Sequence, residues 1–282
     1  MEISPETLMG AVELTVADLD RTLDYWQREI GLRVLEQGDG RASLGTDTEV
    51  LRFVEEPGAQ PDTGYTGLYH VALLVPDRPS LARWLAHAAR DRVPLTGLSD
   101  HSVSEAIYLR DPDHHGIEIY ADRPRELWEG RVGEQLTTLP LDVDDLLGEL
   151  DDGAVESFDG LPDGTSVGHT HLRVADVDST VSFYRDVLGF PLMAQLQSMA
   201  AFLSAGGYHH HVGANIWESA DAEPGPPGTA RLRHATILVP DREELDRVAG
   251  RVADSGQEPD VREDGVLVRD PSGNGLLLAV RP

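Results

Sequence analysis

Histidine and carboxylate side chains are the groups in this 282-residue chain that could bind a metal ion or transfer protons. The sequence contains no cysteine, which excludes thiolate metal ligands, disulfide bonds and a cysteine nucleophile. Histidines stand in apolar, strand-like segments at His70, His171 and His234, and three more follow one another at residues 209–211. Imidazole and carboxylate together suit divalent metals such as Fe(II), and histidine is the commonest general base. These side chains are therefore the candidates for any metal binding or acid–base chemistry.

The elements that must position these residues repeat along the chain. Segment 10–20 resembles segment 168–178, at an offset of 168 − 10 = 158 residues, and segment 69–78 resembles segment 233–242. Each unit begins with a strand of alternating residues, continues with a helix and ends in short strands separated by turn clusters. The repeats predict four modules of the same βαβββ pattern.

Capping residues mark the helices of the first and third modules. Asp18 and Asp176 are expected as N-caps, and Gly31 and Gly189 are expected near the ends of the helices. The predicted fold class is α+β, with βαβββ modules at residues 9–58, 66–124, 166–219 and 231–282.

The four modules form two predicted tandem domains, at residues 9–124 and 166–282. The segment 125–165 belongs to no repeat and contains glycine and proline turns. It also carries an acidic run made of Asp142, Asp144, Asp145, Glu149, Asp151 and Asp152. We interpret this segment as an acidic linker between the domains.

The charge of the chain excludes one class of partner. Fifty acidic residues against 23 basic residues, all of them arginine, give a formal net charge of −27, which repels nucleic acid. This balance fits either a composition bias or adaptation to a salty cytoplasm. The chain shows neither an apolar run of about 18 residues nor a signal peptide, so we expect a cytoplasmic protein without membrane contact. No motif encodes the oligomeric state, and a homo-oligomer stays open.

The repeated modules resemble the vicinal oxygen chelate superfamily, which includes glyoxalases and extradiol ring-cleaving dioxygenases. More narrowly, the strings at residues 67–70, 100–109, 116–124 and 206–213 resemble two-domain bacterial catechol 2,3-dioxygenases. The resemblance implies that two modules pair so that their sheets form an open-barrel cleft around one divalent metal. It also implies that the metal ligands come from the first and last strands of each module.

Three module pairings give different ligand sets at those positions. Pairing modules two and three gives His70, Glu118 and His171, the complete two-histidine, one-carboxylate set that Fe(II) oxygenases use. Pairing modules one and two gives Glu13, His70 and Glu118. Pairing modules three and four leaves no carboxylate, because Leu277 stands where Glu118 would match. We prefer the pairing of modules two and three.

The resemblance also implies acid–base residues beside the metal. A tyrosine ten residues before the glutamate ligand is matched by Tyr108, and a histidine further upstream on the same hairpin is matched by His101. A catalytic histidine in a His-His pair is matched by His210, with His209 as the alternative. We expect these two on an internal strand, where adjacent residues point to opposite faces and only one can face the cleft.

The resemblance therefore implies an Fe(II)-dependent extradiol dioxygenase that cleaves catechol or a substituted catechol with dioxygen, with Mn(II) as the substitute metal. A glyoxalase-type metal-dependent lyase or isomerase stays open, as does a non-enzymatic small-molecule-binding protein. We interpret His169 and His234 as packed core histidines. Glu13 is expected to face a degenerate second cleft near His234.

Overall fold

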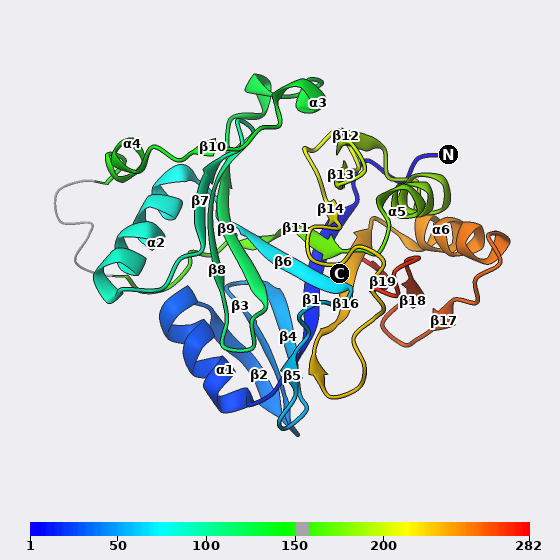
Figure 1. Cartoon of the computed structure of the whole chain (residues 1–282), viewed down its shortest axis with the longest axis horizontal. Helices are drawn as coiled ribbons and strands as arrows, with labels where there is room; N and C mark the ends of the chain where they lie inside the picture. Colours follow the sequence, from blue (N-terminus) through cyan, green and yellow to red (C-terminus); the bar gives the residue numbers. More distant parts are fainter. Residues whose placement is uncertain (151–157) are drawn as a thin grey trace.

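Two curled β-sheets form the framework of the computed structural model, which describes residues 1–150 and 158–282 (Figure 1). The predicted linker residues Asp151 and Asp152 lie outside the described residues. The first sheet has the order β17 (Asp260–Val261), β18 (Val266–Arg269), β19 (Gly275–Val280), β16 (Leu232–Val239), β1 (Leu8–Val16), β4 (Glu49–Glu55), β3 (Arg41–Gly45) and β2 (Arg33–Gly38).

The second sheet contains nine strands and holds most of the residues singled out from the sequence. Its order is β10 (Leu139–Pro140), β7 (Gly97–Asp100), β8 (Ser104–Arg110), β9 (Gly116–Asp122), β6 (Gly67–Leu74), β11 (Ser166–Arg173), β14 (Val212–Asn215), β13 (Ala200–Leu203) and β12 (Leu192–Leu196). Two further short strands, β5 (Gln60–Pro61) and β15 (Thr229–Ala230), pair with each other.

Each sheet combines one module from either half of the chain. The first strands of modules two and three, β6 and β11, pair antiparallel at the centre of the nine-stranded sheet. The first strands of modules one and four, β1 and β16, pair in the same way in the eight-stranded sheet. The predicted α+β fold of βαβββ modules and the preferred pairing of modules two and three are confirmed.

The module helices lie outside the curled sheets (Figure 1). Modules one and three use α1 (Leu19–Tyr25) and α5 (Val177–Ser182), each continued by a π-helical segment, η1 (Trp26–Ile30) or η3 (Phe183–Leu188). Modules two and four use α2 (Arg78–Asp91) and α6 (Arg242–Asp254). The structure confirms the predicted caps. The Asp18 and Asp176 side chains accept backbone N–H bonds of 2.9 and 2.7 Å, and Gly31 and Gly189 end the helices with a φ of 91°.

Alternation along the strands separates the core from the cleft. On β6, Val71 and Leu73 are fully buried in the main hydrophobic core, whereas His70 and Ala72 point to the opposite face. The main core also takes in large helical side chains such as Trp84 of α2. Burying a whole apolar side chain stabilises a fold by about 1.5–3 kcal/mol. The apolar side chains on the outer face of each sheet pack against the helices, and the inner face is left for polar residues.

The segment after β9 is more ordered than a linker. It contains η2 (Arg125–Leu127), α3 (Val132–Gln135), strand β10 and α4 (Val143–Leu147). Trp128 is buried, and its Nε1 donates to the Arg123 carbonyl at 2.9 Å. Two of its acidic residues, Asp145 and Glu149, form ion pairs with Arg78 of α2. The acidic residues therefore anchor the segment to module two. No helix in the described part of the chain is long and apolar enough to cross a membrane.

Candidate active site

A cavity of about 620 Å³ opens on the inner face of the nine-stranded sheet. Side chains from β6, β8, β9 and β11 line it, together with Leu136, Thr137 and Thr138 of the segment after β9. Its volume falls in the range of small-molecule sites. All six site residues predicted from the sequence border this one cavity: His70, His101, Tyr108, Glu118, His171 and His210.

One cross-strand row organises the floor of the cavity. Tyr108 of β8 lies opposite Glu118 of β9, Glu118 lies beside Ala72 of β6, and Ala72 lies opposite His169 of β11. We call these four residues the cross-strand row. His70 stands two residues before Ala72 on β6 and therefore points to the same face. The small Ala72 side chain leaves space between Glu118 and His169.

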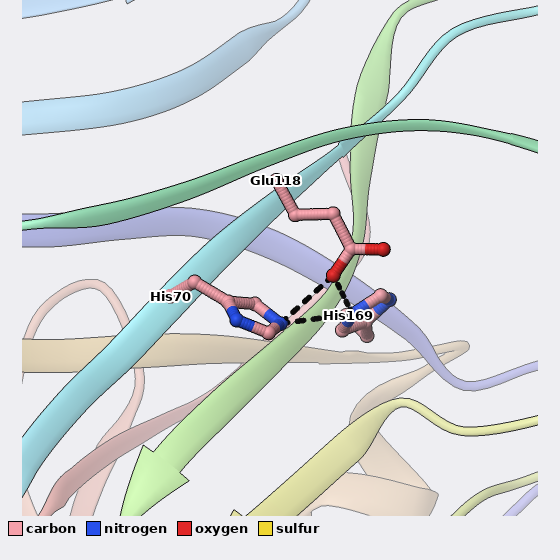
Figure 2. Close-up of side chains that lie close together, drawn as sticks. All are labelled: His70, Glu118 and His169. Carbon is pink, nitrogen blue, oxygen red and sulfur yellow. Dashed lines mark hydrogen bonds and ion pairs between the residues drawn. The ribbon is translucent and has the colours of Figure 1, made fainter. Parts of the chain in front are cut away.

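His70, Glu118 and His169 converge in this space (Figure 2). Glu118 Oε2 lies 2.9 Å from His70 Nε2 and 3.1 Å from His169 Nε2, and the two nitrogens are 3.4 Å apart. All three residues are buried. Ligand atoms about 2.1 Å from a cation and at right angles to each other lie about 3.0 Å apart, which matches this triangle.

The hydrogen-bonding pattern of the three side chains also fits a cation. If both Nε2 atoms donate to Glu118, two donors face each other at 3.4 Å without a bond between them. If both nitrogens direct lone pairs at a shared cation, this conflict disappears. Two imidazoles and one carboxylate are the set that non-haem Fe(II) sites use, so these residues fit such a metal.

His171 takes a different place from the one expected for a third ligand. It lies opposite His70 rather than opposite Ala72, so it stands one row away from Glu118. Its ring packs 4.9 Å from the ring of His70 and 5.6 Å from that of Trp217, and its Nε2 has no hydrogen-bond partner in the described part of the chain. The structure thus brings His169, interpreted from the sequence as a core histidine, to the position expected for His171.

A bulge in β11 accounts for the difference. The pairing of β11 with β6 shifts between Val167 and His169, which places the extra residue Gly168 between them. A Cβ atom at Gly168 would lie 1.8 Å from the Tyr120 hydroxyl, so glycine is required there. The bulge turns His169 to the cavity and puts it in the cross-strand row.

Burial and charge set the ionisation of these groups. Burial opposes ionisation of the Glu118 carboxyl, but its electrostatic and hydrogen-bonding interactions with the His169 and His70 rings outweigh burial and hold the pKa of Glu118 well below its usual range. Burial lowers the pKa of His169 to about 4 and the pKa of His171 well below its usual value. Glu118 is therefore an anion at neutral pH, and both histidines can offer lone pairs.

Tyr108 and His101 form a hydrogen-bonded pair at the edge of the cavity. His101 Nδ1 lies 2.7 Å from the Thr137 carbonyl, which can only accept, so this nitrogen carries the proton. His101 Nε2 therefore accepts from the Tyr108 hydroxyl, 2.7 Å away. Burial and the nearby Glu118 charge raise the pKa of Tyr108 well above its usual range. The hydroxyl stays protonated and leaves its lone pairs free for a substrate.

The three consecutive histidines lie in the loop between β13 and β14, and the expectation of an internal strand there is wrong. Within this loop His210 borders the cavity, with its ring 4.0 Å from that of His169. His209 is fully buried, and its Nε2 donates to Asp122 Oδ1 at 2.9 Å. The Nδ1 atoms of His209 and His210 are 2.8 Å apart.

This chain of contacts fixes the tautomers of both histidines. Because His209 Nε2 donates to the Asp122 carboxylate, His209 Nδ1 is the acceptor and His210 Nδ1 the donor. His210 Nε2 is then left with its lone pair. Asp122 was not among the predicted site residues, although Glu118, Tyr120 and Asp122 alternate on β9 and could have been assigned to one face of the strand.

The comparisons with known proteins agree with this architecture. A family model described as the Glyoxalase/Bleomycin resistance protein/Dioxygenase superfamily matches residues 8–119 and 166–278. The chain is 43% identical over 285 residues to "Catechol-2,3-dioxygenase" of Bacillus subtilis (strain 168), with 99% of each chain covered.

Solved structures with the same fold include glyoxalase I from Zea mays, with a TM-score of 0.61, 16% identity and coverage of 98% of this chain and 92% of that one. The cppA protein from Streptococcus pneumoniae TIGR4 has a TM-score of 0.57 and 12% identity, with 99% of each chain covered. The two family-model matches together cover most of the chain, so it belongs to the Glyoxalase/Bleomycin resistance protein/Dioxygenase superfamily.

Proposed function

We propose that this protein is an extradiol dioxygenase that uses Fe(II) to cleave catechol or a substituted catechol. The observation that carries the proposal is the convergence of two imidazoles and one carboxylate on one side of a 620 Å³ cavity. The 43% identity to a Bacillus subtilis protein named for catechol 2,3-dioxygenation supports the same substrate class. In the reaction, the ring C–C bond beside the diol breaks, and both atoms of dioxygen enter the product as an aldehyde and a carboxylate.

His70, Glu118 and His169 are the proposed metal ligands, in place of the set with His171. The metal supplies positive charge that lowers the pKa of the catechol hydroxyls, and it supplies the redox chemistry that dioxygen requires. Two neutral imidazoles and one carboxylate would leave a bound Fe(II) ion with a net charge of +1, which would attract an anionic substrate. Mn(II) suits the same donors and is the expected substitute.

His210 is the proposed general base. Its Nε2 carries a lone pair because Asp122 and His209 fix the tautomers behind it. Burial lowers the pKa of His210 below its usual value, which keeps the ring neutral at pH 7 and ready to accept a proton from a catechol hydroxyl. Asp122 and His209 are positioning residues, since neither borders the cavity and both act through His210.

Tyr108 and His101 form the proposed second proton-transfer pair. Tyr108 stands next to Glu118 in the cross-strand row, so its hydroxyl lies beside the position of a substrate held near the ligands. It accepts a hydrogen bond from the substrate through its lone pairs and donates its own proton to His101 Nε2. When the Tyr108 hydroxyl takes up a proton from the substrate, it can therefore pass its own proton to His101.

The proposal is tested with protein purified without oxygen and loaded with one equivalent of Fe(II). Catechol in aerated buffer should give the yellow ring-opened product and consume one dioxygen per catechol, measured by absorbance and an oxygen electrode. E118A should abolish both signals, whereas E243A, on the exposed surface of α6, should leave them unchanged. Mn(II)-loaded protein identifies the metal requirement. Product formed only with Mn(II) would contradict the choice of iron, and no product with either metal would contradict the dioxygenase function.

A further inference from the structure

A second cleft lies on the eight-stranded sheet, at the pairing of β1 with β16. It encloses about 310 Å³. Glu13 of β1 lies opposite His234 of β16, and the Glu13 Oε1 atom is 3.9 Å from His234 Nδ1. The prediction that Glu13 faces a second cleft near His234 is confirmed.

The second cleft repeats the framework of the first but not its ligands. In the cross-strand row of the first cleft, Tyr108 lies opposite Glu118. The matching pair in the second cleft is Leu267 on β18 and Leu277 on β19. Leucine cannot bind a metal, and Glu13 with one histidine does not make a complete set. The second cleft is therefore not a copy of the metal site.

Arginine side chains take over the lining of this cleft. Arg231, Arg233, Arg262 and Arg269 border it, against the single carboxylate of Glu13. The local excess of positive charge stands out in a chain with a formal net charge of −27. Because the chain as a whole carries a large negative charge, a grouping of arginines at a concave site is a place where an anion would bind.

Ion pairs with neighbouring carboxylates neutralise some of these arginines but not others. Arg233 is committed to Glu13 at 2.8 Å and to Glu56 at 3.3 Å. Arg269 donates to the Gly273 carbonyl at 2.9 Å and forms no ion pair with any described residue.

Two more polar groups bordering the cleft have hydrogen-bonding capacity left. Among the described residues, Arg262 pairs only with the exposed Asp260 on its own hairpin. The side chain of His234 is 6% exposed, and its Nε2 has no hydrogen-bond partner in the described part of the chain. A buried imidazole nitrogen without a partner costs free energy unless a ligand satisfies it.

We propose that the second cleft binds a small organic carboxylate. The guanidinium groups of Arg262 and Arg269 offer planar pairs of donors that match a carboxylate. Glu13 opposes the double charge of a phosphate more strongly than the single charge of a carboxylate. Leu232, Pro224 and Pro227 supply apolar surface for the organic part of the ligand.

The proposal is tested with benzoate as the probe, using isothermal titration calorimetry on the full chain at 0.15 M salt. The parent protein should bind benzoate more tightly than inorganic phosphate. R269Q should weaken benzoate binding about tenfold, and the double variant R262Q/R269Q should weaken it further, because each substitution removes a charge-assisted hydrogen bond. Both arginines are on the surface, so thermal denaturation should show unchanged folding.

R242Q is the matched control, since Arg242 is an exposed arginine on α6 that pairs with Asp246 outside the cleft. It makes the same change in net charge and should leave benzoate binding unchanged. Absence of benzoate binding to the parent would overturn the proposal. So would full binding in the double variant, which would place benzoate elsewhere, including the first cleft. Phosphate binding as tight as benzoate binding would overturn the choice of a carboxylate.

Discussion

The choice between His169 and His171 as the third metal ligand can be decided by a matched pair of variants. The two histidines stand two residues apart on β11, and both are buried, with 1% and 4% of their surface exposed. Burial lowers the pKa of both, so both are neutral at pH 7. H169A and H171A therefore delete the same neutral side chain from similar surroundings, and both leave a comparable cavity.

The two variants differ in what they remove from the metal site. H169A removes an atom that lies 3.1 Å from Glu118 Oε2 and 3.4 Å from His70 Nε2. H171A removes a ring from the neighbouring row. Loss of a residue that only supports a ligand typically costs 10–100-fold in metal affinity, so loss of a ligand should cost at least about 100-fold. H171A should cost less than about tenfold.

Metal affinity is measured without turnover, by titrating Mn(II) and following the electron paramagnetic resonance signal of the free ion. Circular dichroism and urea denaturation verify that both variants fold. Tight Mn(II) binding by H169A, together with weak binding by folded H171A, would refute the assignment made from the cross-strand row. Equal losses in the two variants would also refute it, because of these two histidines the structure places only His169 in contact with Glu118.

Three further predictions follow from the hydrogen-bond networks. D122N removes the carboxylate that fixes the tautomers of His209 and His210, and a hydrogen bond to a charged group contributes about 1.5–3 kcal/mol. The kcat should therefore fall about 10–100-fold, while Mn(II) affinity stays within threefold. An unchanged kcat would contradict the positioning role. Y108F should lower kcat about 100-fold and leave metal content unchanged, and wild-type turnover in this variant would exclude Tyr108 from proton transfer. Burial lowers the pKa of His211 to about 3 in the folded protein. Between pH 6.5 and 3 the His211 ring is therefore protonated in the unfolded chain but not in the folded protein, so the free energy of unfolding falls as the pH falls. From pH 7 to pH 5, His211 should account for about 2 kcal/mol of lost stability in metal-free protein, and urea denaturation of H211Q should show that much less pH dependence.

The repeated pattern was sufficient to predict the modules. Helix caps such as Asp18 and Gly31 depend on contacts within a few residues, which the sequence displays directly. The pairing of modules two and three followed from chemistry, because only this pairing supplies two histidines and a carboxylate. His70 and Glu118 lie in one module whose strands β6 and β9 keep a regular register, and both border the cavity.

The third ligand could not be chosen from the sequence because it depends on a bulge. With a regular strand, His169 and His171 share one face, and nothing in their spacing ranks them. The extra residue at Gly168 decides which of them lies beside Ala72, and the absence of a side chain at Gly168 makes room for the Tyr120 hydroxyl from another strand. Such a contact between distant segments leaves no local trace apart from the glycine itself.

The two clefts share one backbone framework but differ in the side chains that line them. Both are built on an antiparallel pair of first strands, with last strands flanking them in parallel. In one sheet the row contains Tyr108, Glu118 and His169, and a cation is favoured. In the other sheet Leu267 and Leu277 replace the first two, and arginines border the cleft. Since backbone geometry is shared, the sign of the charge that each cleft attracts must come from these few side chains, which is why function here has to be argued residue by residue.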